Sequence, residues 1–225
     1  MSPGIVVRAR GVARTFGKGP TAVVAVHGVS CEMAAGEQVV LTGPSGSGKT
    51  TLLHLLAGLD VPTSGTVEWP ALGGITDLRP GPIAVVFQVP SLLAPLDVVE
   101  NVALPLLLQG IDRRSARSGA VAALERLGLD SLASKLPEEL SGGQAQRVAV
   151  ARVLAGRPRL ILADEPTGQL DHASAVLVVD ALIEAASITD AALLVNTHDR
   201  AIADRFDVRW SMSGGRLFQN VPSPC

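Results

Sequence analysis

The 225-residue sequence predicts an α/β fold with a mostly parallel sheet. Short apolar, β-branched runs alternate with segments of helical spacing along most of the chain. The run at residues 38–42 ends at a glycine-rich turn, and a helical pattern at 50–59 follows it. The run at 160–163 ends at the two carboxylates Asp164 and Glu165. Because the ends of parallel strands gather at one edge of a sheet, both features predict a ligand site at that edge.

The remaining elements follow from the same periodicities. We expect strands at residues 3–11, 66–69, 83–87 and 192–196, one or two strands within 22–33, and two final strands near 207–219. We expect helices at 98–108, 115–127, 130–135, 144–155, 173–186 and 200–204. The composition of residues 13–20 and 70–82 predicts a turn and a loop.

The composition excludes several classes of protein. Nineteen basic and 21 acidic residues give a net charge of −2, which argues against a binder that neutralises nucleic-acid phosphates. We therefore expect no nucleic-acid partner. Hydrophobic residues make up 47%, so the chain is expected to fold as one domain over residues 1–225 rather than to be disordered. The longest apolar stretches, such as residues 102–108, are far shorter than the ~20 residues of a membrane-spanning helix.

Two cysteines, Cys31 and Cys225, are present without CxxC or Cys/His metal spacing. We expect a buried Cys31 and an exposed Cys225 thiol rather than a disulfide. The N-terminal residues lack the basic-then-apolar order of a signal peptide, which predicts a cytoplasmic chain.

A phosphate-binding loop is the strongest single motif. Its residues match G-x-x-x-x-G-K-[ST]: Gly43, Pro44, Ser45, Gly46, Ser47, Gly48, Lys49 and Thr50. Glycines let successive backbone N–H groups point inward at a phosphate, and the following helix adds the positive end of its dipole. Lys49 is expected at the β- and γ-phosphates, and the Thr50 hydroxyl can ligate Mg²⁺. The motif predicts ATP and Mg²⁺ as ligands.

Three polar residues follow two other predicted strands. Asp164 and Glu165 alternate in direction, which suits Asp164 for the Mg²⁺ shell and Glu165 for a general base. His198, just after the strand at 192–196, could contact the γ-phosphate at the same sheet edge. The other histidines, His27, His54 and His172, lack such neighbours and are expected in the core or on the surface.

A second glycine-rich loop, Leu140-Ser141-Gly142-Gly143-Gln144, precedes the predicted helix at 144–155. It forms a second anion site at a helix N-terminus, which one nucleotide in one chain does not need. The economical arrangement is a dimer in which Ser141 and the Gly142 and Gly143 amides cover the ATP of the partner chain. Hydrolysis of the γ-phosphate would then weaken the interface and open the dimer.

Together the motifs resemble those of the ATP-binding subunits of ABC transporters over residues 5–219. In family order they are the phosphate loop, Phe87-Gln88, residues 140–144, Ala163-Asp164-Glu165-Pro166-Thr167, Gly168-Gln169-Leu170-Asp171 and Asn196-Thr197-His198-Asp199. The stretches at 43–60 and 166–171 resemble most closely the macrolide-exporter, lipoprotein-release and cell-division branch. The segment at 70–82 is shorter than usual in that branch, and Gln169 replaces a serine or asparagine.

The resemblance implies a RecA-like P-loop NTPase core with a mostly parallel sheet, an N-terminal antiparallel β subdomain and an α-helical subdomain at about 92–140. It implies that Glu165 is the catalytic base, assisted by Lys49, Gln88 and His198, and that Thr50, Gln88 and Asp164 face Mg²⁺. The nucleotide would also meet Thr51 and the aromatic Phe16, which stacks on adenine, and across the dimer Ser141, Gly142, Gly143, Gln144 and Asp171.

An ATPase of this kind drives a separate integral membrane permease, with a second copy of the chain as its dimer partner. We expect the chain at the inner face of the cell membrane, with Leu93, Leu96 and Val99 helping to line the permease-docking groove. Other members of the superfamily leave three alternatives: a soluble mechanical ATPase, an ATP-gated regulator of a membrane partner without transport, and a binding-only subunit. The run at residues 113–118 is expected to be a solvated helix start rather than a nucleic-acid patch.

Overall fold

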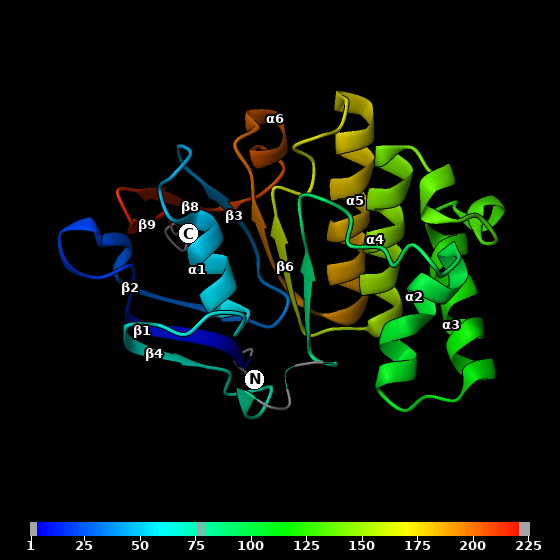
Figure 1. Ribbon diagram of the computed structural model, residues 1–225, viewed down its shortest axis with the longest axis horizontal. Coiled ribbons are helices and arrows are strands. Elements are labelled where there is room, and N and C mark those ends of the chain that lie inside the picture. Colours follow the sequence, from blue (N-terminus) through cyan, green and yellow to red (C-terminus); the bar gives the residue numbers. More distant parts are fainter. Residues whose placement is uncertain (1–3, 76–77, 79, 221–225) are drawn as a thin grey trace.

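The computed structural model describes residues 4–75, 78 and 80–220, and Figure 1 shows its elements. Within these residues the strands form a three-stranded antiparallel sheet and a six-stranded sheet. The antiparallel sheet has the order β2-β1-β4, made of β1 (Ile5–Phe16), β2 (Val23–Ala34) and β4 (Ser64–Glu68). The antiparallel pairing of β1 with both neighbours confirms the expected N-terminal β subdomain.

The larger sheet has the order β5-β6-β7-β3-β8-β9. Its strands are β3 (Gln38–Thr42), β5 (Ile83–Val86), β6 (Leu160–Asp164), β7 (Ala192–Asn196), β8 (Val208–Ser213) and β9 (Arg216–Asn220). All neighbours run parallel except β8 and β9. The mostly parallel α/β fold is therefore confirmed, and the carboxyl ends of β3, β6 and β7 lie at one edge.

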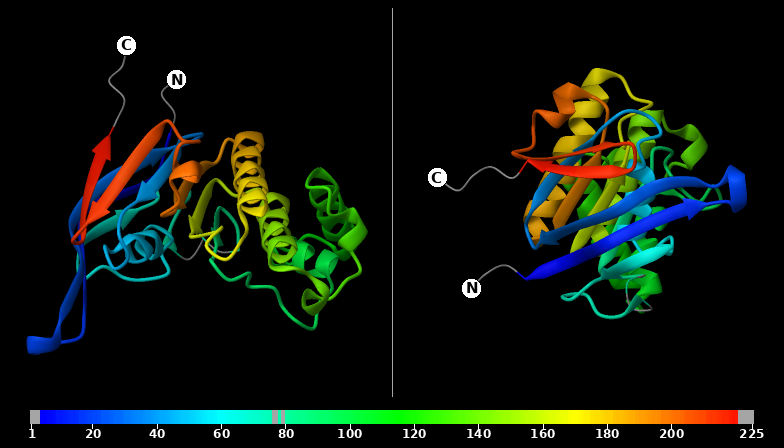
Figure 2. Two further views of the ribbon diagram at one scale, coloured as in Figure 1. Left: turned by 90° about the horizontal axis from the view of Figure 1, so that it is seen from above. Right: turned by 90° about the vertical axis from the view of Figure 1, so that its left-hand side faces the viewer.

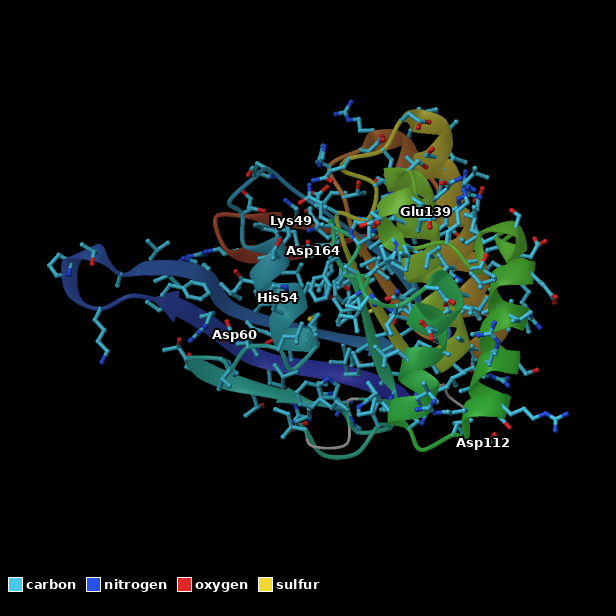
Figure 3. The ribbon with its side chains drawn as sticks, turned by 45° about the vertical axis from the view of Figure 1, so that its right-hand side comes forward. Lys49, His54, Asp60, Asp112, Glu139 and Asp164 are labelled. Atoms are coloured by element: carbon cyan, nitrogen blue, oxygen red, sulfur yellow. The ribbon has the colours of Figure 1, made fainter. Side chains whose placement is uncertain are left out.

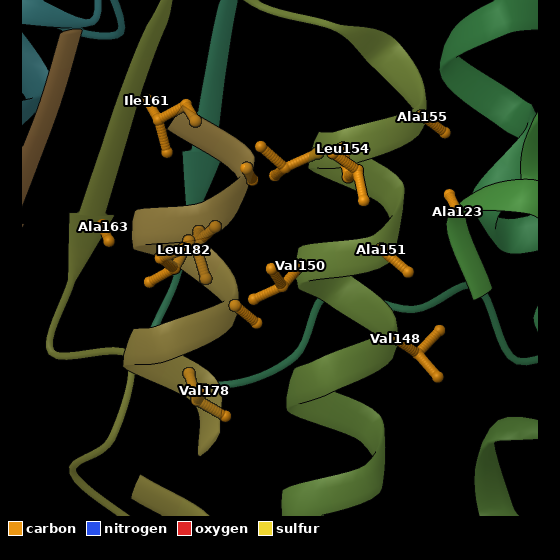
Figure 4. Close-up of a cluster of buried hydrophobic side chains, with 14 of the residues drawn as sticks. Ala123, Val148, Val150, Ala151, Leu154, Ala155, Ile161, Ala163, Val178 and Leu182 are labelled. Carbon is orange, nitrogen blue, oxygen red and sulfur yellow. The ribbon is translucent and has the colours of Figure 1, made fainter. Parts of the chain in front are cut away.

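Both faces of this sheet are buried, because alternate residues of its central strands enter different cores. In β6, Leu160 and Leu162 pack with helix α1 (Lys49–Leu56) and the antiparallel sheet. Ile161 and Ala163 pack instead with the helices on the opposite face. Figure 4 shows these side chains meeting α5 (His172–Thr189) and α4 (Gly142–Gly156).

The helices lie in successive layers beyond the sheet, with α5 and α4 nearest and α2 (Val98–Leu108) and α3 (Arg113–Arg126) farthest (Figure 2, left). Acidic or hydroxyl side chains begin them: Asp97, Asp112, Ser141 and Asp171 each accept a backbone N–H in the first turn. A short helix, α6 (Arg200–Ala203), follows β7 and begins in the same way at Asp199.

Some sequence-based boundaries were wrong. Strand β1 continues to Phe16, into residues expected to form a turn, because it pairs with β2 along its whole length. The expectation of one or two strands within 22–33 is met by the single strand β2. The helix expected at 130–135 is only a 3-10 turn at Asp130–Leu132. The run at 113–118 does begin helix α3, as expected, with Arg113 and Arg114 exposed.

Helix α5 extends beyond the helix expected at 173–186 and is apolar along much of its length, although Asp180 and Glu184 interrupt it. By length and composition its 18 residues, with a mean hydropathy of 1.4, are sufficient to cross a membrane. Ala175, Val178 and Leu182 are buried within the core that α5 shares with α4 and the sheet. In the described fold 39% of α5 is buried, and this part packs against α4 and the sheet.

Candidate nucleotide site

Two glycines of the phosphate loop, Gly43 and Gly48, leave no room for a Cβ atom. A larger residue at either position would force the neighbouring backbone to move. Gly43 and Gly48 have φ of 145° and 97°. A Cβ atom would lie 2.2 Å from the Met212 carbonyl oxygen at Gly43, and 2.1 Å from the Ala25 carbonyl oxygen at Gly48. The loop backbone therefore passes close to β2 and β8, in a conformation that glycine adopts without strain and that can turn N–H groups toward an anion.

Lys49 lies at the start of α1 and folds back over the loop. Its Nζ donates to the carbonyl oxygens of Gly43, at 2.8 Å, and Pro44, at 3.0 Å. The side chain is only 7% exposed. A buried ammonium needs anionic or polar partners, so these bonds hold Lys49 where phosphate oxygens can become its partners. The Ser47 hydroxyl is buried and lacks a hydrogen-bond partner among the described residues, which fits a loop shaped for a ligand.

The loop opens into a cavity of about 730 Å³ at the carboxyl edge of the sheet. It brings together most of the residues predicted from the sequence. The described residues that line it are Ala25, Gly43, Pro44, Ser45, Gly46, Ser47, Gly48, Lys49, Thr50, Thr51, Gln88, Glu165, Asn196 and His198. Ala25 was missed because it belongs to none of the motifs, and Asn196 because only His198 of its motif was expected at the ligand.

Asp164 ends β6 directly opposite the phosphate loop, and Figure 3 shows it beside Lys49. Its Oδ1 accepts a hydrogen bond from the Thr50 hydroxyl at 3.1 Å and another from the amide of Asn196. Asn196 reaches this carboxylate because β7 pairs with β6 so that Asp164 and Asn196 are directly opposed. Its place in the site depends on this pairing, which the sequence alone does not give. Two donors thus orient a buried carboxylate toward the loop.

Thr50, Asp164 and Gln88 offer the hard oxygen ligands that Mg²⁺ prefers. Among the described residues, no group of three or more His, Cys, Asp or Glu side chains gathers into a metal cage. That donor set fits a cation bound by one or two protein oxygens together with phosphate oxygens. The assignment of Mg²⁺ to these residues stays a prediction.

Glu165 adopts a left-handed backbone conformation, φ 48°, immediately after β6. This turn moves its side chain away from Asp164 and toward His198, whose Nδ1 lies 2.7 Å from Glu165 Oε2. Glu165 is 18% exposed at its side chain and His198 is 69% exposed. A non-glycine residue at positive φ is unusual and is found where structure around a functional group enforces it.

Phe16 ends β1 and does not line the cavity formed by the described residues, but it is exposed on the same hairpin as Ala25. The guanidinium of Arg14 lies 4.6 Å from the centroid of its ring. Asp60, after α1, fixes Arg14 through two contacts of 2.8 Å. One face of the Phe16 ring is thus covered by a cation and the ring stays available for stacking.

The loop of Ser141, Gly142, Gly143 and Gln144 lies outside the cavity of its own chain. The Ser141 hydroxyl accepts from the Gln144 N–H at 3.3 Å, and the Gln144 side chain accepts from the Ser141 N–H at 3.0 Å. This capping box begins α4 and leaves Ser141 and Gly142 exposed. A loop that cannot reach its own cavity is what the predicted exchange between two chains requires.

Asp171 lies beside that loop, since Ser174 and Leu170 are the nearest neighbours of Gly143 and Gly142. It was expected in the dimer contact, and it also begins α5. The Ser174 N–H and hydroxyl donate to its carboxylate at 2.9 and 2.8 Å. These bonds lower the pKa of Asp171.

The residues expected at the permease groove differ in exposure. Leu93 is exposed and Leu96 is half-buried, whereas Val99 is only 1% exposed. Leu96 and Val99 both line a hollow of about 350 Å³ between α2 and α3, which Glu100, Arg113 and Arg117 also line. Val99 can therefore form the floor of a groove but offers little surface of its own.

The residues expected to be structural are placed accordingly. Cys31 is buried in β2, and burial, then the nearby Glu32 and Glu37 charges, raise its pKa to about 12. His54 meets Phe87 edge to face, while His27 and His172 are exposed. Cys225 lies outside the described residues.

A phosphate loop joined to a carboxylate strand, with a second glycine loop facing outward, defines the class of nucleotide-binding ATPase cassettes. The sequence profile described as "ABC transporter" matches residues 26–168. The chain belongs to this family and is an ATP-binding, ATP-hydrolysing subunit of an ABC transporter.

Relatives agree with this assignment over almost the whole chain. The chain is 41% identical to the lipoprotein-releasing system ATP-binding protein LolD of Pseudomonas syringae pv. tomato, covering 97% of this chain and 100% of the relative. It is 39% identical to LolD of Legionella pneumophila strain Paris, covering 95% and 97%. These relatives confirm the branch expected from the sequence.

Solved structures share the fold. The dimeric ATP-binding cassette MJ0796 in a post-hydrolysis state bound to ADP and Pi has a TM-score of 0.86 at 32% identity, covering 97% of this chain and all of its own. The protein cbiO1 of Clostridium perfringens, part of the ABC transporter complex cbiONQ, has a TM-score of 0.84 at 27% identity, covering 96% and 88%.

Proposed function

We propose that two copies of this chain close head to tail around two MgATP molecules and that hydrolysis reopens them. The single observation that carries the proposal is the separation of the two phosphate-binding loops. Residues 43–50, Glu165 and His198 line the cavity, whereas Ser141 is exposed outside it. The dimeric state named for MJ0796 supports the same arrangement.

Within the closed site the chain acts mainly by positioning and by neutralising charge. The backbone N–H groups of Ser45, Gly46 and Gly48, together with the Lys49 ammonium, hold the phosphates. Glu165 accepts a proton from the attacking water, and His198 orients that carboxylate and the γ-phosphate. Thr50, Asp164 and Gln88 would hold Mg²⁺, which when bound neutralises charge on the β- and γ-phosphates.

We propose that the dimer powers an exporter-type membrane permease at the cytoplasmic face of the cell membrane. The names of the relatives, lipoprotein-releasing ATP-binding proteins, favour a lipid-bearing cargo over a small nutrient. The permease, rather than this chain, would contact the cargo. The permease would dock on the hollow that Leu96, Val99, Glu100, Arg113 and Arg117 line. The exposed Leu93, whose carbonyl oxygen accepts from the Leu96 N–H at 3.1 Å, would extend this docking groove.

A membrane pull-down tests the partner. Tagged Glu165→Gln protein with MgATP is held closed and is recovered from membranes of the source cell. Recovery of a polytopic membrane protein is expected, and its extracytoplasmic domain would separate export from a regulatory role. Recovery of soluble or nucleic-acid partners alone would contradict the proposal.

A charge in the docking groove tests where the partner binds. Leu93→Glu is expected to abolish permease-stimulated turnover while leaving the turnover of the isolated chain unchanged, because an exposed side chain outside the cavity is altered. Val61→Glu, at an apolar residue elsewhere that is more exposed than Leu93, is the control. Intact stimulation in the Leu93 variant would place the groove elsewhere.

A further inference from the structure

The segment that carries Gln88 is held by helices rather than by the sheet from which it leaves. Residues 87–92, called here the Gln88 loop, follow directly after β5, whose partner is β6. Gln88 lines the cavity, and its Nε2 lies 2.9 Å from where a Cβ of Gly168 would be. The position of Gln88 therefore depends on what fixes the backbone on either side of it.

Helix α4 fixes this loop at both ends. Gln146 Nε2 donates to the Phe87 carbonyl oxygen at 2.9 Å. Arg152 donates from Nη1 to the Ser91 carbonyl oxygen at 2.7 Å and from Nη2 to the Ser91 hydroxyl at 2.8 Å. Desolvation against the loop lowers the pKa of Arg152, as expected for a guanidinium packed on backbone.

The chain beyond the loop is held by α2. Asn101, which is fully buried, accepts from the Leu93 N–H at 2.7 Å and donates to the Leu96 carbonyl oxygen at 2.9 Å. Side chains of α4 and α2 thus replace the strand pairing that ends at Val86. A shift of these helices relative to the sheet must be absorbed close to Phe87 and Gln88.

The same helix carries the loop that faces the partner chain. Ser141 begins α4, and Gln146 follows it by five residues, about 7.5 Å along the helix axis. A helix of this length moves as a rigid body, so a displacement of Ser141 is transmitted to Gln146 and Arg152. α4 therefore joins the surface that meets the partner's nucleotide to the loop that enters the chain's own cavity.

We propose that Gln146 and Arg152 are positioning residues that set Gln88 in the cavity according to where the partner chain holds the start of α4. The proposal rests on the proposed function, because it needs Gln88 to act at the nucleotide and Ser141 to act in trans. It gives each ATP site a physical connection to the other. Gln146 and Arg152 themselves bond only the Gln88 loop and do not touch the reacting atoms.

Gln146 is placed for such a role rather than for stability. Its side chain is 1% exposed, and its Oε1 has no hydrogen-bond partner among the described residues. An unpaired buried acceptor costs stability and offsets the bond that Nε2 makes. Replacement by methionine, which is unbranched and of similar length, is therefore expected to leave the fold and its Tm nearly unchanged.

A double-mutant cycle in the full-length chain tests the proposal with MgATP as the probe. Gln146→Met is expected to lower kcat by up to about a hundredfold, as a misplaced positioned group does, without changing the Kd for MgATP. In a Gln88→Ala background the same change is expected to have no further effect, because it acts through Gln88. Arg152→Met should behave likewise, and Arg152→Lys should restore part of the activity.

Arg126→Met, on an exposed position of α3 in the same group of helices, is the control and is expected to be neutral. If the double variant loses activity by the product of the fold-losses of Gln146→Met and Gln88→Ala, the two residues act independently and the proposal is overturned. An unchanged kcat in both Gln146→Met and Arg152→Met would overturn it as well. If Gln146→Met fails to fold, the Arg152→Met and Arg152→Lys variants test the proposal in its place. If Gln88→Ala itself is silent, the proposed role of Gln88 fails first, which distinguishes the two failures.

Discussion

Glu165 Oε2 and His198 Nδ1 lie 2.7 Å apart although 33 residues separate them in the chain. They meet because β6 and β7 are adjacent and parallel, with Asp164 directly opposite Asn196. Each side chain follows the end of its strand, where the sheet edge borders the phosphate loop. The carboxylate is thereby oriented by a ring nitrogen at the cavity, where we propose that it acts as the base.

Replacement of this carboxylate is expected to stop chemistry but not binding. Glu165→Gln keeps the size and the contact with His198 and removes the proton acceptor. We expect the rate of phosphate release to fall by about 10²- to 10⁴-fold, with the Kd for MgATP within a few-fold of the unchanged chain. Steady-state phosphate release and equilibrium nucleotide binding measure the two. Turnover unaffected by the change would remove Glu165 from the mechanism.

The Thr50 hydroxyl is expected to set the Mg²⁺ requirement. Thr50→Val removes the donor 3.1 Å from Asp164 Oδ1 while keeping the shape of the side chain. The Mg²⁺ concentration for half-maximal turnover should rise at least about tenfold, since one oxygen ligand and one bond orienting another are lost. A Mg²⁺ titration of turnover at fixed ATP measures this half-maximal concentration. Thr51→Val, whose hydroxyl is not bonded to Asp164 in the described contacts, should shift it less.

Phe16 is expected to recognise the adenine ring of ATP and not its phosphates. Phe16→Ala should weaken MgATP binding about two- to tenfold, the value of one stacked aromatic pair. Binding of inorganic tripolyphosphate should not change, and Phe16→Trp should restore the affinity. Calorimetric titration with both ligands measures the difference. Equal weakening for both would show that Phe16 acts on the loop structure instead.

The arginine behind this ring gives a matched variant. Arg14→Met removes the cation 4.6 Å from the ring centroid and the ion pair with Asp60 but keeps an apolar stem. It should weaken MgATP binding less than Phe16→Ala does, in the same direction and again without effect on tripolyphosphate.

The buried thiol predicts a change of stability with alkaline pH. The pKa of Cys31 is raised from 9.0 to about 12 by burial, so the folded chain binds this proton more tightly than the unfolded chain. The contribution of the protonated Cys31 thiol to the free energy of unfolding is therefore complete below pH 9 and is lost as the pH rises from about 9 to about 12. Denaturant titrations should show that Cys31→Ala removes this part of the alkaline loss. An identical pH profile in the variant would contradict the assignment.

Local signals in the sequence were sufficient for the phosphate loop and for the strands before Asp164 and His198. Their spacing needs only residues close in the chain, and parallel topology then brings the strand ends together. Asn196 was missed because its role depends on the register of β7 against β6. Gln146 and Arg152 were missed because each bonds a backbone group about 60 residues away. The extension of β1 to Phe16 was likewise missed, because it is set by pairing with β2 rather than by the pattern of β1 itself.

The mass of the Glu165→Gln chain in solution tests the central claim most directly. Light scattering with size-exclusion chromatography should give one 23.2 kDa chain without nucleotide and two with MgATP. Adding Ser141→Arg to the same chain should abolish the two-chain species while leaving nucleotide binding intact. A single-chain mass at saturating, demonstrably bound MgATP would contradict the exchange of loops between two copies.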